Sequence, residues 1–281
     1  KVAGAAIDTF VQEPLKNSPL QQLEGKVILT PHLGASTEEA QVNVSVDVAE
    51  QVYDVLKGLP ARSALNIPSM APHLLREVQF HFSLLEKLGR FLGQWVTEAI
   101  QAVEISYFGE LIEKDTSPLK VAALYGLLKP ILKDGVNYVN ALLLADERGI
   151  DVEESKHSTS HDYTNLVQVK VQTEKKAYSI AGTIIAEREE RIVKIGEFPI
   201  SCTPSGCLLI VPHPDKPGMV GKIGQLLGNH DINISGIQLG RHQVRGEAIM
   251  VVNIDDPITP ELFKEMQACS EFQHTRVIEL T

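Results

Sequence analysis

The stretch CLLIVPHPDKPGMVGKIGQLLGNHDINI, residues Cys207–Ile234, decides the fold at the end of the chain. It begins with an apolar run typical of a buried strand, and Pro217 and Gly218 then open a helix. The apolar face of this helix consists of Met219, Val220, Ile223, Leu226 and Leu227. A glycine-asparagine pair ends the helix, and a second apolar strand follows.

The residues after this stretch complete a small domain. Ala248–Ile254 and Val277–Leu280 are apolar enough for two further strands. Leu262, Phe263 and Met266 mark a helix between them. The resulting βαββαβ order is that of a ferredoxin-like unit, which we assign to residues 207–281.

A second domain is expected between residues 73 and 206, after a proline-rich linker that we end near Pro72. Its first helix has an apolar stripe made of Leu84, Leu85, Leu88, Phe91, Leu92 and Trp95. We expect a strand at 102–108, helices at 118–132 and 136–147, and further strands that begin with the alternating Val167–Val171 segment. This domain is therefore α+β.

The first part, residues 1–72, has the pattern of a parallel α/β sheet. Val2–Ile7 and Val27–Leu29 are continuous apolar runs, as expected for strands buried on both faces. Ser36 and Glu39 form a capping-box pattern for a helix that should run to Lys57 and bury the face of Val44, Val48, Val52 and Val55. Because the chain opens at Lys1 directly with core-like sequence, we expect it to begin within a domain.

Composition limits the class of protein. The chain has 281 residues, a net charge of −10 and 43% hydrophobic residues, and it lacks an apolar run long enough for a membrane span. The acidic balance argues against a nucleic-acid partner. Cys202, Cys207 and Cys269 have neither zinc nor disulfide spacing, which favours a reducing compartment.

Asp8, Glu13 and His32 form the first candidate constellation. His32 follows a predicted buried strand and precedes a helix, the edge at which open α/β sheets bind ligands. Histidine moves protons near neutral pH, and Glu13 could orient its ring and raise its pKa. The alternative from composition alone is that His32 is an ordinary loop residue.

The second constellation is His213, Asp215, Pro217 and Gly218, followed by Asn233. A free helix N-terminus offers N–H groups to a carboxylate, and an acidic or amide side chain accepts hydrogen bonds from an ammonium group. The alternative is that Asp215 caps the helix and that Asn233 ends a turn.

Three motifs in the first part resemble the NAD-binding domain of the D-2-hydroxyacid dehydrogenases. They are GAAID with a later EP (Gly4–Asp8, Glu13 and Pro14), LTPHLGAST (Leu29–Thr37) and LNIP (Leu65–Pro68). The resemblance implies that His32 is the general acid/base and that Glu13 is its partner. It also implies that Asp8 lies beside the nicotinamide and that His32, Leu33, Gly34 and Ala35 line the NAD site.

The family's substrate-binding arginine and its G-x-G-x-x-G turn are not found in this sequence. Gly218, Gly221 and Gly224 have the wrong spacing for that turn, so we interpret them as helix-packing glycines. The chain alone is therefore expected to lack turnover. The fold class that follows is a C-terminal remnant of a Rossmann-type domain, an α+β intervening domain and a ferredoxin-like domain.

The second constellation resembles the signature of ACT domains. In serine-biosynthetic dehydrogenases this signature implies L-serine, bound between two ACT domains paired side by side, with His213, Asp215 and Asn233 at the matching positions. Asp215 stands where the family often has asparagine. The resemblance therefore also implies a homo-oligomer.

The middle part resembles the additional domain of long-form phosphoglycerate dehydrogenases through LEKLG, Leu85–Gly89. In some relatives it binds an anion, but Arg188, Arg191 and Lys194 are offset here by neighbouring glutamates. His157 and His161 have the spacing of a metal pair in a polar segment without a third ligand, which favours a loop and no metal.

Taken together, the resemblance implies an NAD-dependent dehydrogenase that oxidises 3-phospho-D-glycerate to 3-phosphooxypyruvate in L-serine biosynthesis and is inhibited by L-serine. The expected location is the cytoplasm, or the plastid stroma in a plant or alga. The alternative is a non-catalytic regulatory protein whose ACT domain senses an amino acid.

Overall fold

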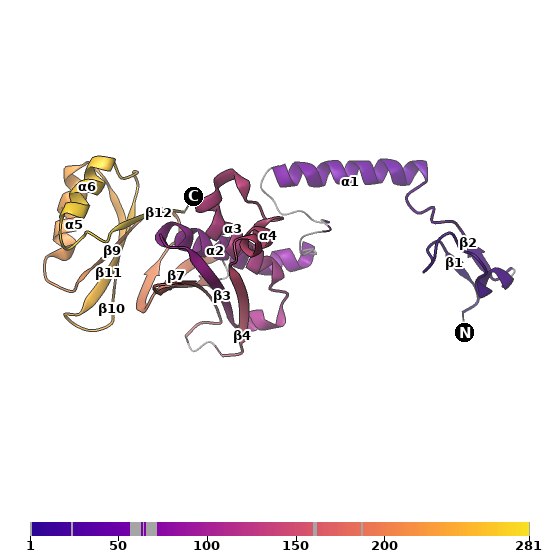
Figure 1. Cartoon of the computed structure of the whole chain (residues 1–281), viewed down its shortest axis with the longest axis horizontal. Helices are drawn as coiled ribbons and strands as arrows, with labels where there is room; N and C mark the ends of the chain where they lie inside the picture. The colour runs from indigo at the N-terminus through magenta and orange to yellow at the C-terminus, as the bar shows by residue number, and fades with distance from the viewer. Residues whose placement is uncertain are drawn as a thin grey trace. The chain divides into compact units, whose positions relative to one another are not determined.

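The computed structural model describes residues 2–23, 25–56, 63, 65, 72–159, 162–186 and 188–280. The chain divides into two compact units, Lys1–Ala64 and Leu65–Thr281. In Figure 1 the first unit carries the labels β1, β2 and α1, and the second carries α2 to β12. The expected helix end at Lys57 and most of the LNIP motif lie outside the described residues.

The first unit contains two short parallel strands and a long helix. Its elements are β1 (Ala5–Ile7), the 3-10 helix η1 (Pro19–Gln22), β2 (Val27–Leu29) and α1 (Glu38–Leu56). The strands pair in parallel with Ala6 opposite Ile28, as expected for an α/β sheet. β1 is shorter than the predicted Val2–Ile7, whereas β2 has the predicted bounds. Neither strand is buried, with Ile28 68% exposed, because a two-stranded sheet leaves both faces open.

The start of α1 is close to the prediction, but its cap and burial are not as expected. Thr37 caps the helix instead of Ser36, since the hydroxyl of Thr37 accepts the N–H of Ala40 at 3.1 Å. The helix has no buried residue, and Val44, Val48, Val52 and Val55 are all exposed. The prediction of a buried face was therefore wrong for the described residues, since no described element of this unit packs on the valine stripe.

The middle domain is α+β, as predicted, with a six-stranded sheet, although the helix expected at 136–147 begins only at Ala141. The strand order is β4-β3-β5-β6-β7-β8, antiparallel except for the parallel pair of β3 and β4. Its helices are α2 (Pro72–Trp95), α3 (Ser117–Leu132) and α4 (Ala141–Glu147) with η2 (Glu110–Glu113) and η3 (Lys133–Gly135). Its strands are β3 (Ile100–Gly109), β4 (Asp151–His157), β5 (Asn165–Thr173), β6 (Ala177–Ile185), β7 (Glu189–Ile195) and β8 (Phe198–Cys202).

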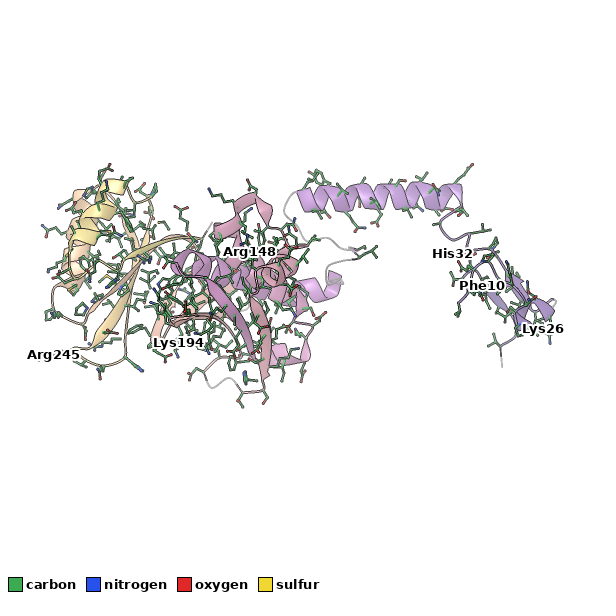
Figure 2. All side chains as sticks on the ribbon, viewed as in Figure 1. Phe10, Lys26, His32, Arg148, Lys194 and Arg245 are labelled. Carbon is green, nitrogen blue, oxygen red and sulfur yellow. The ribbon has the colours of Figure 1, made fainter. Side chains whose placement is uncertain are left out.

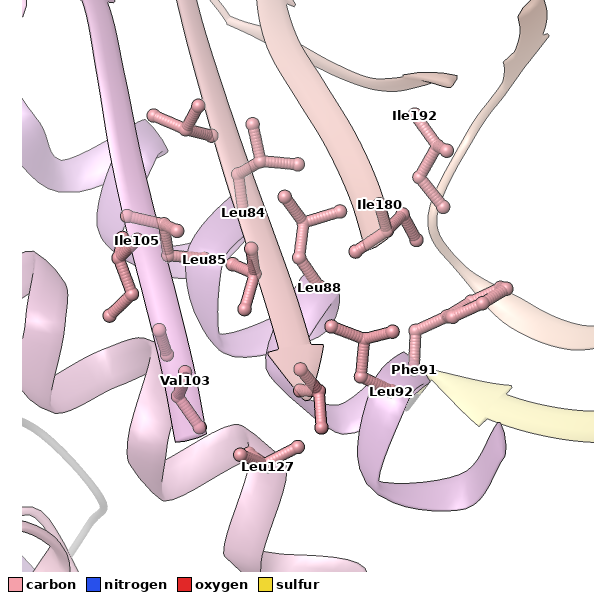
Figure 3. Close-up of a cluster of buried hydrophobic side chains, with 14 of the residues drawn as sticks. Leu84, Leu85, Leu88, Phe91, Leu92, Val103, Ile105, Leu127, Ile180 and Ile192 are labelled. Atoms are coloured by element: carbon pink, nitrogen blue, oxygen red, sulfur yellow. The ribbon is translucent and has the colours of Figure 1, made fainter. Parts of the chain in front are cut away.

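The predicted stripe of α2 packs against the sheet, and Figure 3 shows its leucines facing residues of β3, β6 and α3. Leu84, Leu85, Leu88, Phe91 and Leu92 are all fully buried. On another side α2 approaches α3 so closely that a Cβ on Gly89 would lie 2.1 Å from the carbonyl oxygen of Ala123. Only glycine permits this backbone contact, which gives the LEKLG motif a packing role.

Two polar segments of the middle domain, Asp151–His157 and β7, are strands. Asp151–His157 is an edge strand that the sequence reasoning did not predict, and the ring of His157 stacks on Phe108 at 4.7 Å. Ser158 and Thr159, in the segment predicted to be a loop, belong to neither a helix nor a strand. His161 lies outside the described residues. The basic groups of β7 are paired, Arg191 with Glu189 and Lys194 with Glu197, both at 3.4 Å, as expected for a solvated charged strand.

The C-terminal domain has the predicted βαββαβ order. Its elements are β9 (Gly206–Pro214), α5 (Met219–Asn229), β10 (Ile234–Arg241), β11 (Glu247–Ile254), α6 (Pro260–Ala268) and β12 (Arg276–Leu280). The antiparallel sheet has the order β10-β11-β9-β12, so β10 and β12 are its edges. Gly221 and Gly224 have no atom within 4 Å of a built Cβ, so they are not packing glycines, and Gly218 is a left-handed N-cap.

Both faces of this sheet are buried. Leu209 and Val211 face α5 and α6, whereas Leu208 and Ile210 belong to the core of the middle domain. Gln94 of α2 also binds the free edge of β12. Its Nε2 donates to the carbonyl of Glu279, and its Oε1 accepts the N–H of Glu279, both at 2.9 Å. The middle and C-terminal domains therefore share one core.

We predict that Gly126→Ala destabilises the larger unit. A Cβ on Gly126 of α3 would lie 1.9 Å from the backbone oxygen of Glu86, so the helices must separate, and overpacking of this kind costs about 1–3 kcal/mol. Urea unfolding followed by circular dichroism measures this cost. Gly224→Ala in α5 is the control, expected to raise the free energy of unfolding by up to ~1 kcal/mol through helix propensity. Equal effects of the two changes would contradict the close packing of α2 and α3.

Candidate functional site

His32 lies in the loop after β2, and the side chain of Asp8 holds this loop in place. One carboxylate oxygen of Asp8 accepts the hydroxyl of Thr30 at 2.6 Å and the N–H of Leu33 at 2.7 Å, and the other accepts the N–H of Gly34 at 2.8 Å. These bonds, first that from Thr30, lower the pKa of Asp8 below its usual value. His32 itself has a positive φ of 59°. Asp8 therefore fixes the backbone that presents the histidine.

Glu13 orients the ring of His32, as the sequence predicted for this pair. Nδ1 of His32 lies 2.8 Å from Oε2 of Glu13, and Oε1 of Glu13 accepts the N–H of Phe10 at 2.9 Å. With Nδ1–H donated to the carboxylate, Nε2 is the ring nitrogen left for proton transfer. The hydrogen bond to Glu13 raises the pKa of His32, and the same bond lowers the pKa of Glu13.

A cavity of about 420 Å³ adjoins the histidine; its lining includes His32, Glu13, Phe10, Pro14 and Leu15. Figure 2 shows His32 and Phe10 in the same small unit. The supporting roles of Thr30 and Phe10 were missed by the sequence reasoning. A hydroxyl at this position has no motif of its own, and the Phe10 contact uses only its backbone N–H.

The predicted cofactor residues Leu33, Gly34 and Ala35 belong to this same loop. The N–H groups of Leu33 and Gly34 are already donated to Asp8, and the carbonyls of Leu33 and Ala35 accept hydrogen bonds from Ser36 and Gln41. The exposed His32 side chain is therefore the group of this loop that faces a ligand. These residues fit the nicotinamide end of NAD but not its pyrophosphate, which needs free N–H donors. The role of each residue toward NAD stays a prediction.

His213, Asp215 and Gly218 of the second constellation line a cavity of about 530 Å³ at the start of α5. His213, at the end of β9, is 6% exposed; its Nδ1 donates to the carbonyl of Pro214 at 2.8 Å. Among the described residues its Nε2 has no partner. With Nδ1–H donated to Pro214, the tautomer places the acceptor of a neutral imidazole at Nε2, so the cavity suits a ligand that carries a donor group.

Asp215 lies beside this histidine and is held by the turn between β10 and β11. Its Oδ2 accepts the N–H of Arg245 at 3.0 Å and a guanidinium N–H of Arg241 at 3.2 Å. These bonds, first that from Arg245, lower the pKa of Asp215 and favour the carboxylate form. Figure 2 shows Arg245 at the tip of this hairpin. Sequence reasoning missed Arg241 because the hairpin register brings it to Asp215 across 26 residues.

Asn233 is not brought to the same cavity within one chain. Ala248 pairs with His213 at one end of β11, whereas Ile254 pairs with Ile234 at the other. At about 3.3 Å per residue, Asn233 lies about 20 Å from His213 along the sheet. Its amide instead donates to Asp255 at 2.5 Å. A single copy therefore assembles His213 and Asp215 but not Asn233.

Across the described ranges, no three or more His, Cys, Asp or Glu side chains are grouped to hold a metal ion. Each described helix is too short or too polar to cross a membrane.

Comparisons with known proteins agree with this organisation. Residues 77–196 match the D-3-phosphoglycerate dehydrogenase intervening domain, and residues 208–271 match the ACT domain. A D-3-phosphoglycerate dehydrogenase of Synechocystis is 44% identical over the whole chain and is covered over 50% of its own length. Proteins of the same name from Bacillus subtilis and Methanocaldococcus jannaschii are each 38% identical and are covered over 53% of their lengths. The chain thus spans about half the length of the curated relatives it matches.

We predict that Glu13→Gln lowers the pKa of His32. The substitution removes the negative charge that favours the imidazolium, so His32 should lose its proton at lower pH than in the unaltered chain. An NMR titration of the His32 ring protons measures the shift. Glu39→Gln, an equal change of charge in α1, is the control and should leave the His32 titration in place. An unaltered His32 titration in Glu13→Gln would show that the pair does not form in solution.

Proposed function

Because the chain belongs to the D-3-phosphoglycerate dehydrogenase family, we propose that it contributes to an enzyme that oxidises 3-phospho-D-glycerate to 3-phosphooxypyruvate with NAD. The observation that carries this proposal is the His32–Glu13 pair, whose ring and carboxylate atoms lie 2.8 Å apart. A loop braced by Asp8 presents this pair beside a cavity. This arrangement favours the enzyme over a non-catalytic sensor, which has no need of an oriented acid/base pair.

In this proposal His32 removes the proton of the substrate's 2-hydroxyl group through Nε2. Glu13 receives Nδ1–H and stabilises the positive charge that the ring gains, which explains why a raised pKa of His32 suits the task. NAD, held beside Leu33 and Gly34, would supply the acceptor for the hydride that leaves the carbon bearing this hydroxyl group. The fixed loop at Leu33 and Gly34 keeps the ring at one position during the transfer.

We also propose that the ACT domain binds L-serine as an inhibitor. The serine carboxylate would meet the start of α5, where no acidic residue occupies the first turn. The ammonium group suits Asp215, and the acceptor Nε2 of His213 suits a donor of the ligand, such as its hydroxyl. The position of Asp215 in place of the usual asparagine adds a full negative charge for the ammonium.

This binding site requires two copies of the chain. β10 is an open edge, whereas Gln94 already binds the β12 edge. Antiparallel pairing of two β10 strands, centred near Ile237, would bring the Asn233 end of one copy to the Arg241 end of the other. The missing amide would then reach the cavity of His213 and Asp215. We therefore propose a homo-oligomer that pairs through its ACT domains.

The three cysteines are free thiols, and burial raises the pKa of Cys202 to about 12. A thiol that is protonated at neutral pH is a poor nucleophile, so Cys202 is not suited to redox chemistry. We propose a reducing location, either the cytoplasm or the plastid stroma. Among the relatives of this chain, two from Arabidopsis thaliana are named as chloroplastic.

We predict that His32→Asn in the whole enzyme lowers kcat for 3-phospho-D-glycerate oxidation by about 10²–10⁴-fold, the usual contribution of a general acid/base. His230→Asn is a matched control, because His230 also forms an exposed pair with a glutamate, Glu265, at 2.8 Å. Its kcat should equal that of the unaltered enzyme. Stopped or continuous NADH assays measure both variants, and full activity in His32→Asn would exclude the catalytic role.

We predict that Asn233→Ala abolishes or weakens L-serine binding at least tenfold, because it removes the amide that the paired copy would supply to the ligand. Isothermal titration of the chain with L-serine measures this loss, with D-serine as the stereochemical control. Asn229→Ala at the end of α5 is the matched substitution and should bind like the unaltered chain. Equal L-serine affinity in Asn233→Ala and Asn229→Ala would remove Asn233 from the effector site.

A further inference from the structure

Arg241 is the last residue of β10 and lies on the helix side of the ACT sheet. Ile237 of the same strand packs in the core under α5 and α6, and alternation places Leu239 and Arg241 on that same face. Leu239 and Arg241 both line the cavity of His213 and Asp215. Arg241 belongs to none of the motifs found in the sequence.

The guanidinium of Arg241 uses little of its bonding capacity. Its one hydrogen bond within the described residues is the contact with Oδ2 of Asp215 at 3.2 Å, although arginine carries five N–H donors. Its side chain is 58% exposed, compared with 24% for Asp215. Most of its donors are therefore available to a ligand in the cavity without breaking the pair.

The carboxylate of Asp215 is used on one side only. Oδ2 accepts hydrogen bonds from the guanidinium of Arg241 and the backbone N–H of Arg245. Among the described residues, no group donates a hydrogen bond to Oδ1. The cavity thus presents a free acceptor oxygen and free guanidinium donors side by side. An α-amino acid carries an ammonium group and a carboxylate on a single carbon, which is the complementary arrangement of charges.

We propose that Arg241 is a specificity-determining residue that recognises the α-carboxylate of the effector while Asp215 binds its ammonium group. The inference rests on the proposed binding of an amino acid at this cavity and deepens it. Arginine matches a carboxylate by two parallel N–H bonds, which the partial charge of the α5 N-terminus does not supply. The buried His213, 6% exposed and unpartnered at Nε2, supports a ligand at the same place.

A different role for Arg241 would be to position Asp215 alone. In that case removal of the guanidinium would weaken every ligand that uses Asp215, whether or not the ligand has a carboxylate. If Arg241 binds the carboxylate, only ligands with that group should lose affinity. Ethanolamine separates the two roles, because it keeps the ammonium and hydroxyl groups of serine and lacks the carboxylate.

The test measures L-serine and ethanolamine binding to the full chain by isothermal titration, with ligand-observed NMR for millimolar affinities. For Arg241→Gln we expect L-serine to bind at least tenfold more weakly and ethanolamine to bind unchanged, the size expected for a charged hydrogen bond. Arg241→Lys keeps the charge and should recover part of the loss. Arg148→Gln, an exposed arginine beyond α4 (Figure 2), is the matched control and should bind like the unaltered chain.

Two results would overturn the proposal, and they differ from the failure of the effector assignment. Unchanged L-serine affinity in Arg241→Gln would mean that the α5 N-terminus suffices for the carboxylate. An equal loss for L-serine and ethanolamine would leave Arg241 as a positioning residue only. If the unaltered chain binds no L-serine at all, the proposed effector site fails and this inference fails with it.

Discussion

The burial of α2 on three sides holds the larger unit of this protein together. One side carries the apolar stripe that packs on the six-stranded sheet, and a second meets α3 at backbone distance through Gly89 and Gly126. At its C-terminal end, Gln94 satisfies the backbone of β12 in the ACT domain. A helix with three such neighbours cannot shift toward one without losing contact with another, so the intervening and ACT domains are fixed to a common element.

The two candidate sites share the same arrangement of an aspartate and a histidine. At each site an aspartate accepts backbone N–H groups of a neighbouring loop, Asp8 from Leu33 and Gly34, and Asp215 from Arg245. At each site the histidine donates Nδ1–H to a fixed oxygen and keeps Nε2 for a ligand. The difference lies in exposure. His213 is buried, as suits tight binding of a small molecule, whereas the side chain of His32 is 58% exposed and open to a substrate.

The sequence predicted the elements whose periodicity is strong. The α2 stripe and the βαββαβ order were correct because their apolar residues meet a core inside this chain. The valine stripe of α1 has the same periodicity and was assigned to a core wrongly, since spacing indicates which face is apolar but not what covers it. The polar strand Asp151–His157 escaped prediction because an edge strand needs few apolar residues.

The sequence by itself determined which residues could do chemistry here. The motif around His32, the paired Glu13 and the loop from His213 to Gly218 are read directly from residue types, since proton transfer and anion binding require particular side chains. Only the tertiary structure decided which of them meet. It brought Arg241 to Asp215 and left Asn233 at the opposite end of the sheet. It also placed the carboxylate of Asp8 where its oxygen atoms accept backbone N–H groups of the His32 loop. The reason is physical: strand register and loop closure fix distances between residues far apart in sequence, and no local pattern carries that information.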